Sequence, residues 1–96
     1  MEIDFQGDLG QLFEDARYDG AHSRAVVKSF RKRVTAIYAA TDERDIRAVK
    51  GNHFEKLSGK KGEHSIRLND QWRLIMTFEV RNGVKTVVLL RIVDYH

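Results

Sequence analysis

Three residues with acid–base and stacking chemistry, Asp94, Tyr95 and His96, directly follow an apolar run. Imidazole titrates near neutral pH, so His96 suits the role of a general acid or a general base. The carboxylate of the chain end beside it favours the protonated ring. A tyrosine ring such as Tyr95 can stack on a nucleobase. These residue types therefore indicate chemistry on RNA.

The sequence predicts that an arginine lies beside this group. An Asn-Gly pair at 82–83, between two alternating apolar runs, predicts a two-residue hairpin turn. With that turn Arg73 lies opposite Ile92, and alternation places Arg73 on the same face as Asp94 and His96. Two aromatic residues fall on the other face unless a bulge intervenes: Trp72 and Tyr95.

Such a group could cleave RNA without a metal ion. The 2′-hydroxyl must lose a proton and attack its neighbouring phosphate, while the leaving 5′-oxygen gains a proton. The planar fork of Arg73 suits the charge that develops on the phosphate. Asp94 could orient Arg73 or His96. The spacing alone leaves a second interpretation open, in which Arg73 is a surface strand residue and Asp94–His96 a frayed polar end.

The elements that would position these residues are those of a single α+β domain, residues 1–96, with helices on one side of a curved, mostly antiparallel sheet of four to five strands. Apolar residues at helical spacing predict two helices in the first half of the chain. In the second half the apolar residues recur at every second position, which predicts strands. We expect a strand at 1–5, helices within 8–20 and 21–41, a polar turn-like segment at 42–52 and strands at 53–57, 63–68, 72–80 and 84–93.

Composition narrows the function classes. The chain is 42% apolar and 32% charged, and it contains no cysteine. These values indicate a globular cytoplasmic protein without disulfides, and no segment has the form of a membrane helix or a signal peptide. Residues 1–20 carry a net charge of −5 and residues 21–96 a net charge of +8. The basic part favours contact with nucleic acid, although a merely solvated basic surface is the alternative.

Two stretches, HSIRLNDQWR at 64–73 and VDYH at 93–96, resemble the HigB-type toxins, also called plasmid-maintenance killer proteins, of the RelE/ParE superfamily. The resemblance implies a microRNase-like fold and a cytoplasmic, ribosome-dependent endonuclease that cuts mRNA in the ribosomal A site. It implies a HigA-type helix-turn-helix antitoxin, contact with operator DNA only through that antitoxin, and no membrane, metal or cofactor.

The resemblance also assigns residues. The family attributes catalysis to the arginine of the Trp-Arg motif and to the last three residues, which match Arg73, Asp94, Tyr95 and His96. Some members carry a catalytic histidine where this chain has Glu55. The nearby histidines His53 and His64 are candidates to replace that catalytic histidine. Glu55, which occupies its position, is a third candidate.

Basic residues around the expected site are interpreted as contacts to RNA phosphates. Two other functions share the fold: binding of DNA gyrase, as in ParE-type toxins, and RNA-binding or regulation by a catalytically weak member of the family. The cluster of Arg73 with the last three residues favours the endonuclease over the gyrase binder. The expected RNA-contacting residues are Lys56, Lys60, Lys61 and Arg67.

Overall fold

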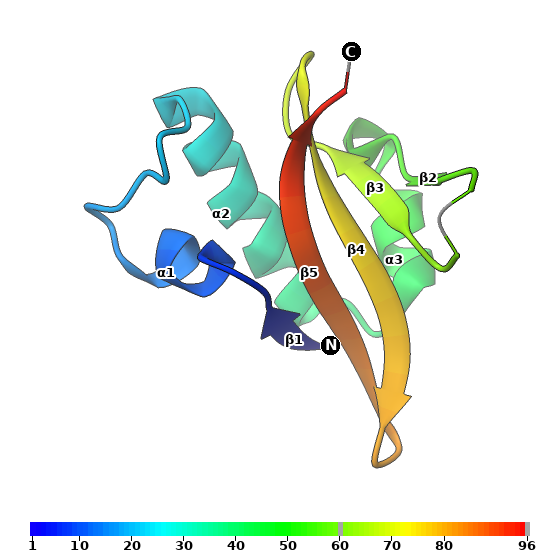
Figure 1. Cartoon of the computed structure of the whole chain (residues 1–96). Helices are drawn as coiled ribbons and strands as arrows, with labels where there is room; N and C mark the ends of the chain where they lie inside the picture. Colours follow the sequence, from blue (N-terminus) through cyan, green and yellow to red (C-terminus); the bar gives the residue numbers. More distant parts are fainter. Residues whose placement is uncertain (60, 96) are drawn as a thin grey trace.

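The structure is a computed structural model that describes residues 1–59 and 61–95 (Figure 1). It confirms the expected α+β class, with five strands, three α-helices and one 3-10 helix in these ranges. In chain order the elements are β1 (Glu2–Phe5), α1 (Leu9–Glu14), α2 (Arg24–Ala39), α3 (Glu43–Ala48), the 3-10 helix η1 (Lys50–Asn52), β2 (Glu55–Lys56), β3 (His64–Arg67), β4 (Trp72–Arg81) and β5 (Val84–Asp94).

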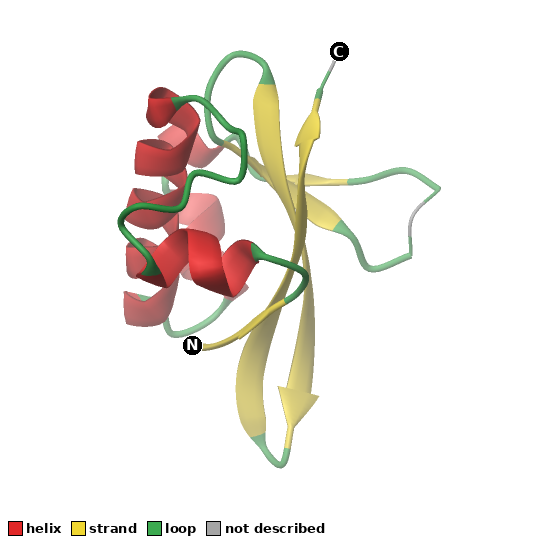
Figure 2. Cartoon of the chain, turned by 60° about the vertical axis from the view of Figure 1, so that its left-hand side comes forward, coloured by secondary structure: helices red, strands yellow, loops and turns green. Residues whose placement is uncertain are grey.

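The five strands form one mixed sheet in the order β1-β5-β4-β3-β2. β1 runs parallel to β5, and the other neighbouring pairs are antiparallel. The helices cover one face of this sheet, and the opposite face is left without a helix (Figure 2). We call the face without helices the open face. Among the described helices, none is long and apolar enough to span a membrane.

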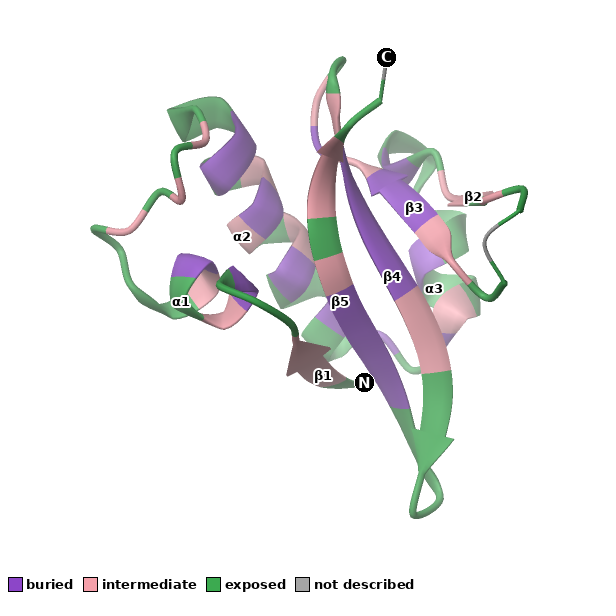
Figure 3. Cartoon of the chain, viewed as in Figure 1, coloured by how far each residue is buried: buried purple, intermediate pink, exposed green. Residues whose placement is uncertain are grey.

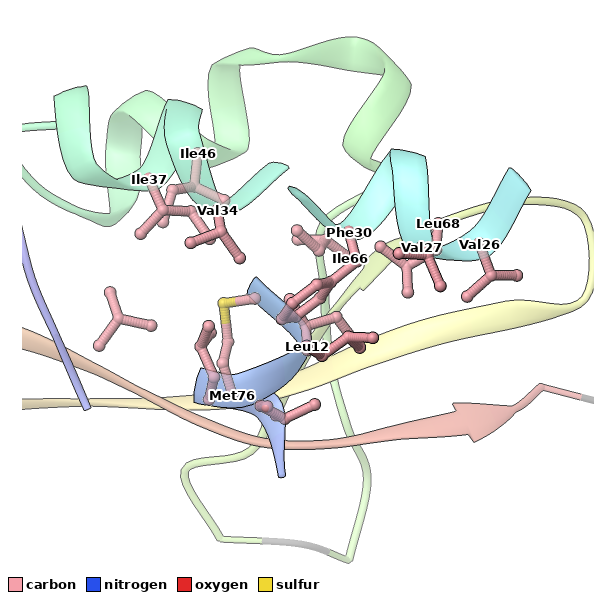
Figure 4. Packing of buried hydrophobic residues seen from close by; sticks show 14 of the residues in the cluster. Leu12, Val26, Val27, Phe30, Val34, Ile37, Ile46, Ile66, Leu68 and Met76 are labelled. Atoms are coloured by element: carbon pink, nitrogen blue, oxygen red, sulfur yellow. The ribbon is translucent and has the colours of Figure 1, made fainter. Parts of the chain in front are cut away.

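Helix α2 joins the sheet through its apolar stripe. Its Ser23 cap accepts a hydrogen bond from Val26 N, and Phe30 and Val34 are completely buried. Side chains of α2 and of the sheet meet in the layer between them (Figure 4). The buried residues of β4 and β5 lie in the first half of each strand (Figure 3). Tyr38 also falls on this stripe by its helical spacing, but it lies near the end of α2 and is exposed.

The segment predicted as turn-like contains α3 and η1. The Asp42 side chain caps α3 by accepting a hydrogen bond from Arg44 N at 2.9 Å. Hydrogen bonds from Arg44 and from Lys85 hold the pKa of Asp42 well below its usual range. Ile46 of α3 is buried and packs into the hydrophobic core. The two short helices carry the chain from α2 to the far edge of the sheet, where β2 begins.

The β4–β5 hairpin has the predicted turn but not the predicted register along its whole length. Asn82 and Gly83 have φ of 50° and 79°, and the pairing runs as expected from the turn to Met76 opposite Leu89. Ile75 then pairs with Arg91, so Leu90 is an extra residue in β5. Beyond this bulge every partner moves by one position.

The bulge changes which residues of the chain end face Arg73. Arg73 lies opposite Val93 instead of Ile92, and Asp94 lies opposite Trp72. The prediction that Arg73 and Asp94 share a face is therefore wrong. The face of Arg73 instead receives Tyr95, whose backbone N–H donates to Gln71 O at 2.7 Å and so holds the chain beyond the end of β5.

Candidate active site

The open face brings together polar residues from three strands. On β4, Leu74 and Met76 point into the helix-covered core, so the alternating residue Arg73 belongs to the open face. Paired residues share a face, and the ladder places Arg67 opposite Arg73. Ser65 lies on the same face of β3, and it is paired with Glu55 of β2.

Arg73 is almost completely buried, with 5% of its surface exposed. Its Nε donates to Ser65 Oγ at 3.0 Å, and its Nη2 donates to the carbonyl oxygen of His53 at 2.5 Å. The same Nη2 lies 3.4 Å from a carboxylate oxygen of Glu55. No hydrogen bond from Nη1 lies among the described residues. The guanidinium is thus fixed on one side and retains donors for a ligand on another.

Tyr95 covers this guanidinium and is tied to Glu55. Arg73 Cζ lies 4.7 Å from the centroid of the Tyr95 ring, within the range of a cation–π contact. The phenol oxygen lies 3.0 Å from both carboxylate oxygens of Glu55 and donates to this carboxylate. The hydrogen bond to Glu55, the negative charge of that residue and burial raise the pKa of Tyr95, against a smaller opposite effect of Arg73. The phenol therefore stays protonated at neutral pH.

A hollow opens beside these side chains. Arg67 contributes a second guanidinium to its wall and forms an ion pair with Asp70. A small anion in this hollow would meet the guanidinium groups of Arg67 and Arg73 beside the ring of Tyr95, and it would compete with Asp70 for Arg67. The hollow is lined by His53, Arg67, Asn69, Asp70, Arg73 and Tyr95.

Several predicted residues lie away from this hollow. Asp94 accepts a hydrogen bond from Gln71 Nε2 at 2.9 Å on the other face of the sheet. His64 stacks on the ring of Phe54, with centroids 5.1 Å apart, and pairs with the core residue Met76. The structure therefore does not bring His64 or Asp94 against Arg73.

Three of the predicted RNA-contacting residues lie in the described part of the chain, on β2, on β3 and in the loop between these strands. Lys56 is exposed at the end of β2, and Lys61 is exposed in the loop that follows. Of these three described residues, Arg67 alone lines the hollow. Two of the predicted residues, His96 and Lys60, lie outside the described residues.

Sequence reasoning missed two parts of the site. Ser65 is completely buried and accepts from Arg73, but a serine inside a short strand carries no signal of that role. His53 was considered for its imidazole, whereas its main-chain carbonyl makes the contact with Arg73. Strand register would have found Ser65 once β3 was aligned with β4, because Ser65 and Arg67 alternate onto the face of Arg73.

Comparison with known proteins identifies the class of this domain. A family model described as the RelE-like toxin of type II toxin-antitoxin system HigB matches residues 4–96. The α+β fold with its unclosed mixed sheet agrees with a RelE-like toxin. A type II toxin implies an antitoxin as partner.

A curated relative narrows the class to a family. Toxin HigB-1 of Vibrio cholerae serotype O1 (strain ATCC 39315 / El Tor Inaba N16961) is 35% identical over 86 residues. The alignment covers 88% of this chain and 88% of the relative. The chain belongs to the HigB-like family of RelE-like toxins.

Proposed function

We propose that this toxin is a ribosome-dependent endoribonuclease that cuts mRNA in the ribosomal A site and so inhibits translation. The observation that carries the proposal is the buried, oriented guanidinium of Arg73 beside Glu55 and Tyr95 on the open face. Toxins of the family to which the chain belongs are generally endoribonucleases. A group that only has to bind a protein would not require this arrangement of cation, carboxylate and phenol.

The proposed reaction is an intramolecular transesterification at one phosphodiester linkage of the RNA. A base removes the proton of the 2′-hydroxyl, the 2′-oxygen bonds to the adjacent phosphorus, and the bond from phosphorus to the 5′-oxygen breaks. The 5′-oxygen takes a proton from an acid. The products are a 2′,3′-cyclic phosphate and a 5′-hydroxyl, so atoms and charges balance without a metal or another cofactor.

Each residue has a role that follows from its chemistry. Arg73 stabilises the charge that develops on the phosphate oxygens. Glu55 is a carboxylate next to Arg73 and suits the role of general base. The Tyr95 ring stacks on a base of the RNA, and Arg67 holds a neighbouring phosphate. We assign the proton on the leaving 5′-oxygen to His96, because an imidazole suits the role of a general acid near neutral pH and Glu55 is proposed as the base.

The remaining residues and partners complete the proposal. Asp94 accepts a hydrogen bond from Gln71 and so helps to hold the end of the chain against the start of β4. Lysines in and after β2 contact phosphates of the mRNA or of the ribosomal RNA. A HigA-type antitoxin neutralises the toxin and brings it to operator DNA, all in the cytoplasm. The further proposed phosphate contacts are Lys56, Lys60 and Lys61, while His53 and His64 are not assigned as proton carriers.

A cell-free translation reaction tests this function. Purified toxin is added, and the 5′ ends of the mRNA are mapped by primer extension, with naked mRNA and a chain stopped at Tyr95 run in parallel. We expect cuts that require ribosomes and that disappear without His96. If the toxin stopped the growth of cells that express it but produced no cuts in this reaction, the proposal would be contradicted. Inhibition of DNA gyrase by the purified protein would then favour the ParE-like function.

A further inference from the structure

One residue of the site has an unusual backbone conformation. His53 follows η1 with φ of 44° and ψ of 53°, in the left-handed region of the backbone map. A residue with a Cβ rarely adopts this backbone conformation, because the Cβ comes too close to the carbonyl oxygen. Backbone outliers of this kind are concentrated at functional sites. The conformation directs the carbonyl of His53 differently from that of a residue in an ordinary strand.

The segment before His53 holds it in place. Asn52 is buried, and its side chain donates to Ile46 O of α3 at 2.9 Å. The backbone N–H of Asn52 donates to Val49 O at 3.0 Å, and that of His53 donates to Lys50 O at 3.2 Å. The backbone of His53 is therefore held by contacts with η1 and, through Asn52, with α3.

The fixed carbonyl is one of the acceptors that orient Arg73. It receives Nη2 at 2.5 Å, while Ser65 Oγ receives Nε at 3.0 Å. Two acceptors on two different nitrogens fix the plane of a guanidinium. Both of these acceptors are uncharged, whereas the Glu55 carboxylate, 3.4 Å from Nη2, partly offsets the charge of Arg73. The imidazole of His53 forms no hydrogen bond among the described residues.

We infer that His53 is a positioning residue, whose left-handed backbone aims its carbonyl at Arg73 and fixes the guanidinium for the scissile phosphate. Its imidazole is not required for the reaction. The inference deepens the proposed function and rests on it for the effect on cleavage. The orientation of Arg73 itself can be measured without any RNA.

Two substitutions separate the carbonyl from the imidazole. His53→Gly removes the ring and adopts the left-handed region without strain, whereas His53→Val removes the ring and disfavours that region because valine is β-branched. We expect His53→Gly to cut on ribosomes at least about tenfold faster than His53→Val, because glycine keeps the carbonyl in place. His53→Val should lower kcat on the order of 10²-fold, with KM nearly unchanged, because the cation is misplaced.

A second readout follows Arg73 directly. In the wild type and in His53→Gly, the Nε–H of Arg73 should give a narrow ¹⁵N NMR signal that exchanges slowly with water, and His53→Val should broaden or shift it. Arg73→Lys identifies the signal by its loss. In the Arg73→Lys background, the difference in cleavage between the Gly and Val variants should vanish, whereas a general loss of stability would persist.

The outcomes are distinct. Equal loss of cleavage in His53→Gly and His53→Val would assign the role to the imidazole and overturn the inference. An unchanged Arg73 signal in His53→Val would overturn it as well. If wild-type protein cut no mRNA but the Arg73 signal responded as expected, the proposed function would fail while the positioning by His53 stood.

Discussion

The ring of Tyr95 lies over the guanidinium of Arg73, with Arg73 Cζ 4.7 Å from the ring centroid. Phosphate oxygens bind a guanidinium in its plane, whereas an aromatic ring occupies its face, so the two contacts can exist together. A phosphate on Arg73 would therefore lie beside the ring of Tyr95. This places a stacking surface next to the bond that we propose is cleaved.

Replacement of Arg73 by lysine tests the planar fork. Lysine keeps a positive charge but cannot donate to Ser65 and to His53 while it also binds two phosphate oxygens. We expect Arg73→Lys to lower cleavage by about 10²-fold, measured by primer extension on ribosome-bound mRNA. Arg91→Lys is the matched control, because Arg91 is exposed and pairs with Glu63. Equal activity of the two variants would remove Arg73 from the reaction.

Glu55→Gln tests the proposed general base. Glutamine preserves the shape of the side chain but cannot accept a proton at neutral pH, so cleavage should fall by about 10²-fold or more. Glu63→Gln makes the same change just before β3, at a carboxylate that pairs with Arg91 and not with Arg73, and should cut like the wild type. Near-normal cleavage by Glu55→Gln, with a folded protein by circular dichroism, would assign the base elsewhere.

The pKa of Tyr95 provides a test that needs no RNA. Glu55 raises the pKa of Tyr95 through its hydrogen bond and its charge, so Glu55→Gln should lower that pKa towards the ordinary value of tyrosine. The chain has three tyrosines, and Tyr18→Phe with Tyr38→Phe leaves Tyr95 as the one that titrates. Its ultraviolet absorbance is then followed against pH.

The sign of the pH effect follows from the direction of the shift. A raised pKa in the folded state means that the interaction stabilises the fold fully below the ordinary pKa of tyrosine. The contribution is lost as the pH rises through the pKa of the folded protein. An identical titration curve with and without Glu55→Gln would show that the two side chains do not interact in solution.

Tyr95→Phe and Tyr95→Leu separate the ring from the hydroxyl. Phenylalanine keeps the stacking surface and releases the Glu55 carboxylate, so cleavage should stay within about threefold of the wild type. Leucine loses the stack on a nucleobase, and cleavage should fall by about tenfold or more. The two variants are compared in single-turnover reactions on ribosomes. If phenylalanine were as inactive as leucine, the hydroxyl would be a proton donor in the reaction.

Some structural features of the candidate site were predictable from the sequence, and others were not. The hairpin turn was predictable because Asn82 and Gly83 adopt positive φ and define the register locally. The bulge was not predictable, since Leu90 lies between Leu89 and Arg91 in a run without a glycine, and nothing marks which residue is extra. That single residue decides whether Asp94 or Tyr95 faces Arg73.

The contacts across the site also had no local signal. Glu55 and Tyr95 are 40 positions apart in the chain, and β2, which carries Glu55, contains only two residues. Its position depends on pairing with β3 and on the helices before it. The backbone conformation of His53 depends on the same tertiary contacts, so a pattern of apolar and polar residues could not predict it.

The most direct test of the central claim uses a substrate that lacks the attacking group. Ribosomes carry an mRNA with a single 2′-deoxynucleotide at the mapped cleavage position, and the matched all-ribose mRNA is run beside it. We predict that wild-type protein cuts the ribose substrate to a 2′,3′-cyclic phosphate and a 5′-hydroxyl and leaves the deoxy substrate intact. Cleavage of the deoxy substrate at the same position would contradict attack by the 2′-hydroxyl, and with it the roles assigned to Glu55 and Arg73.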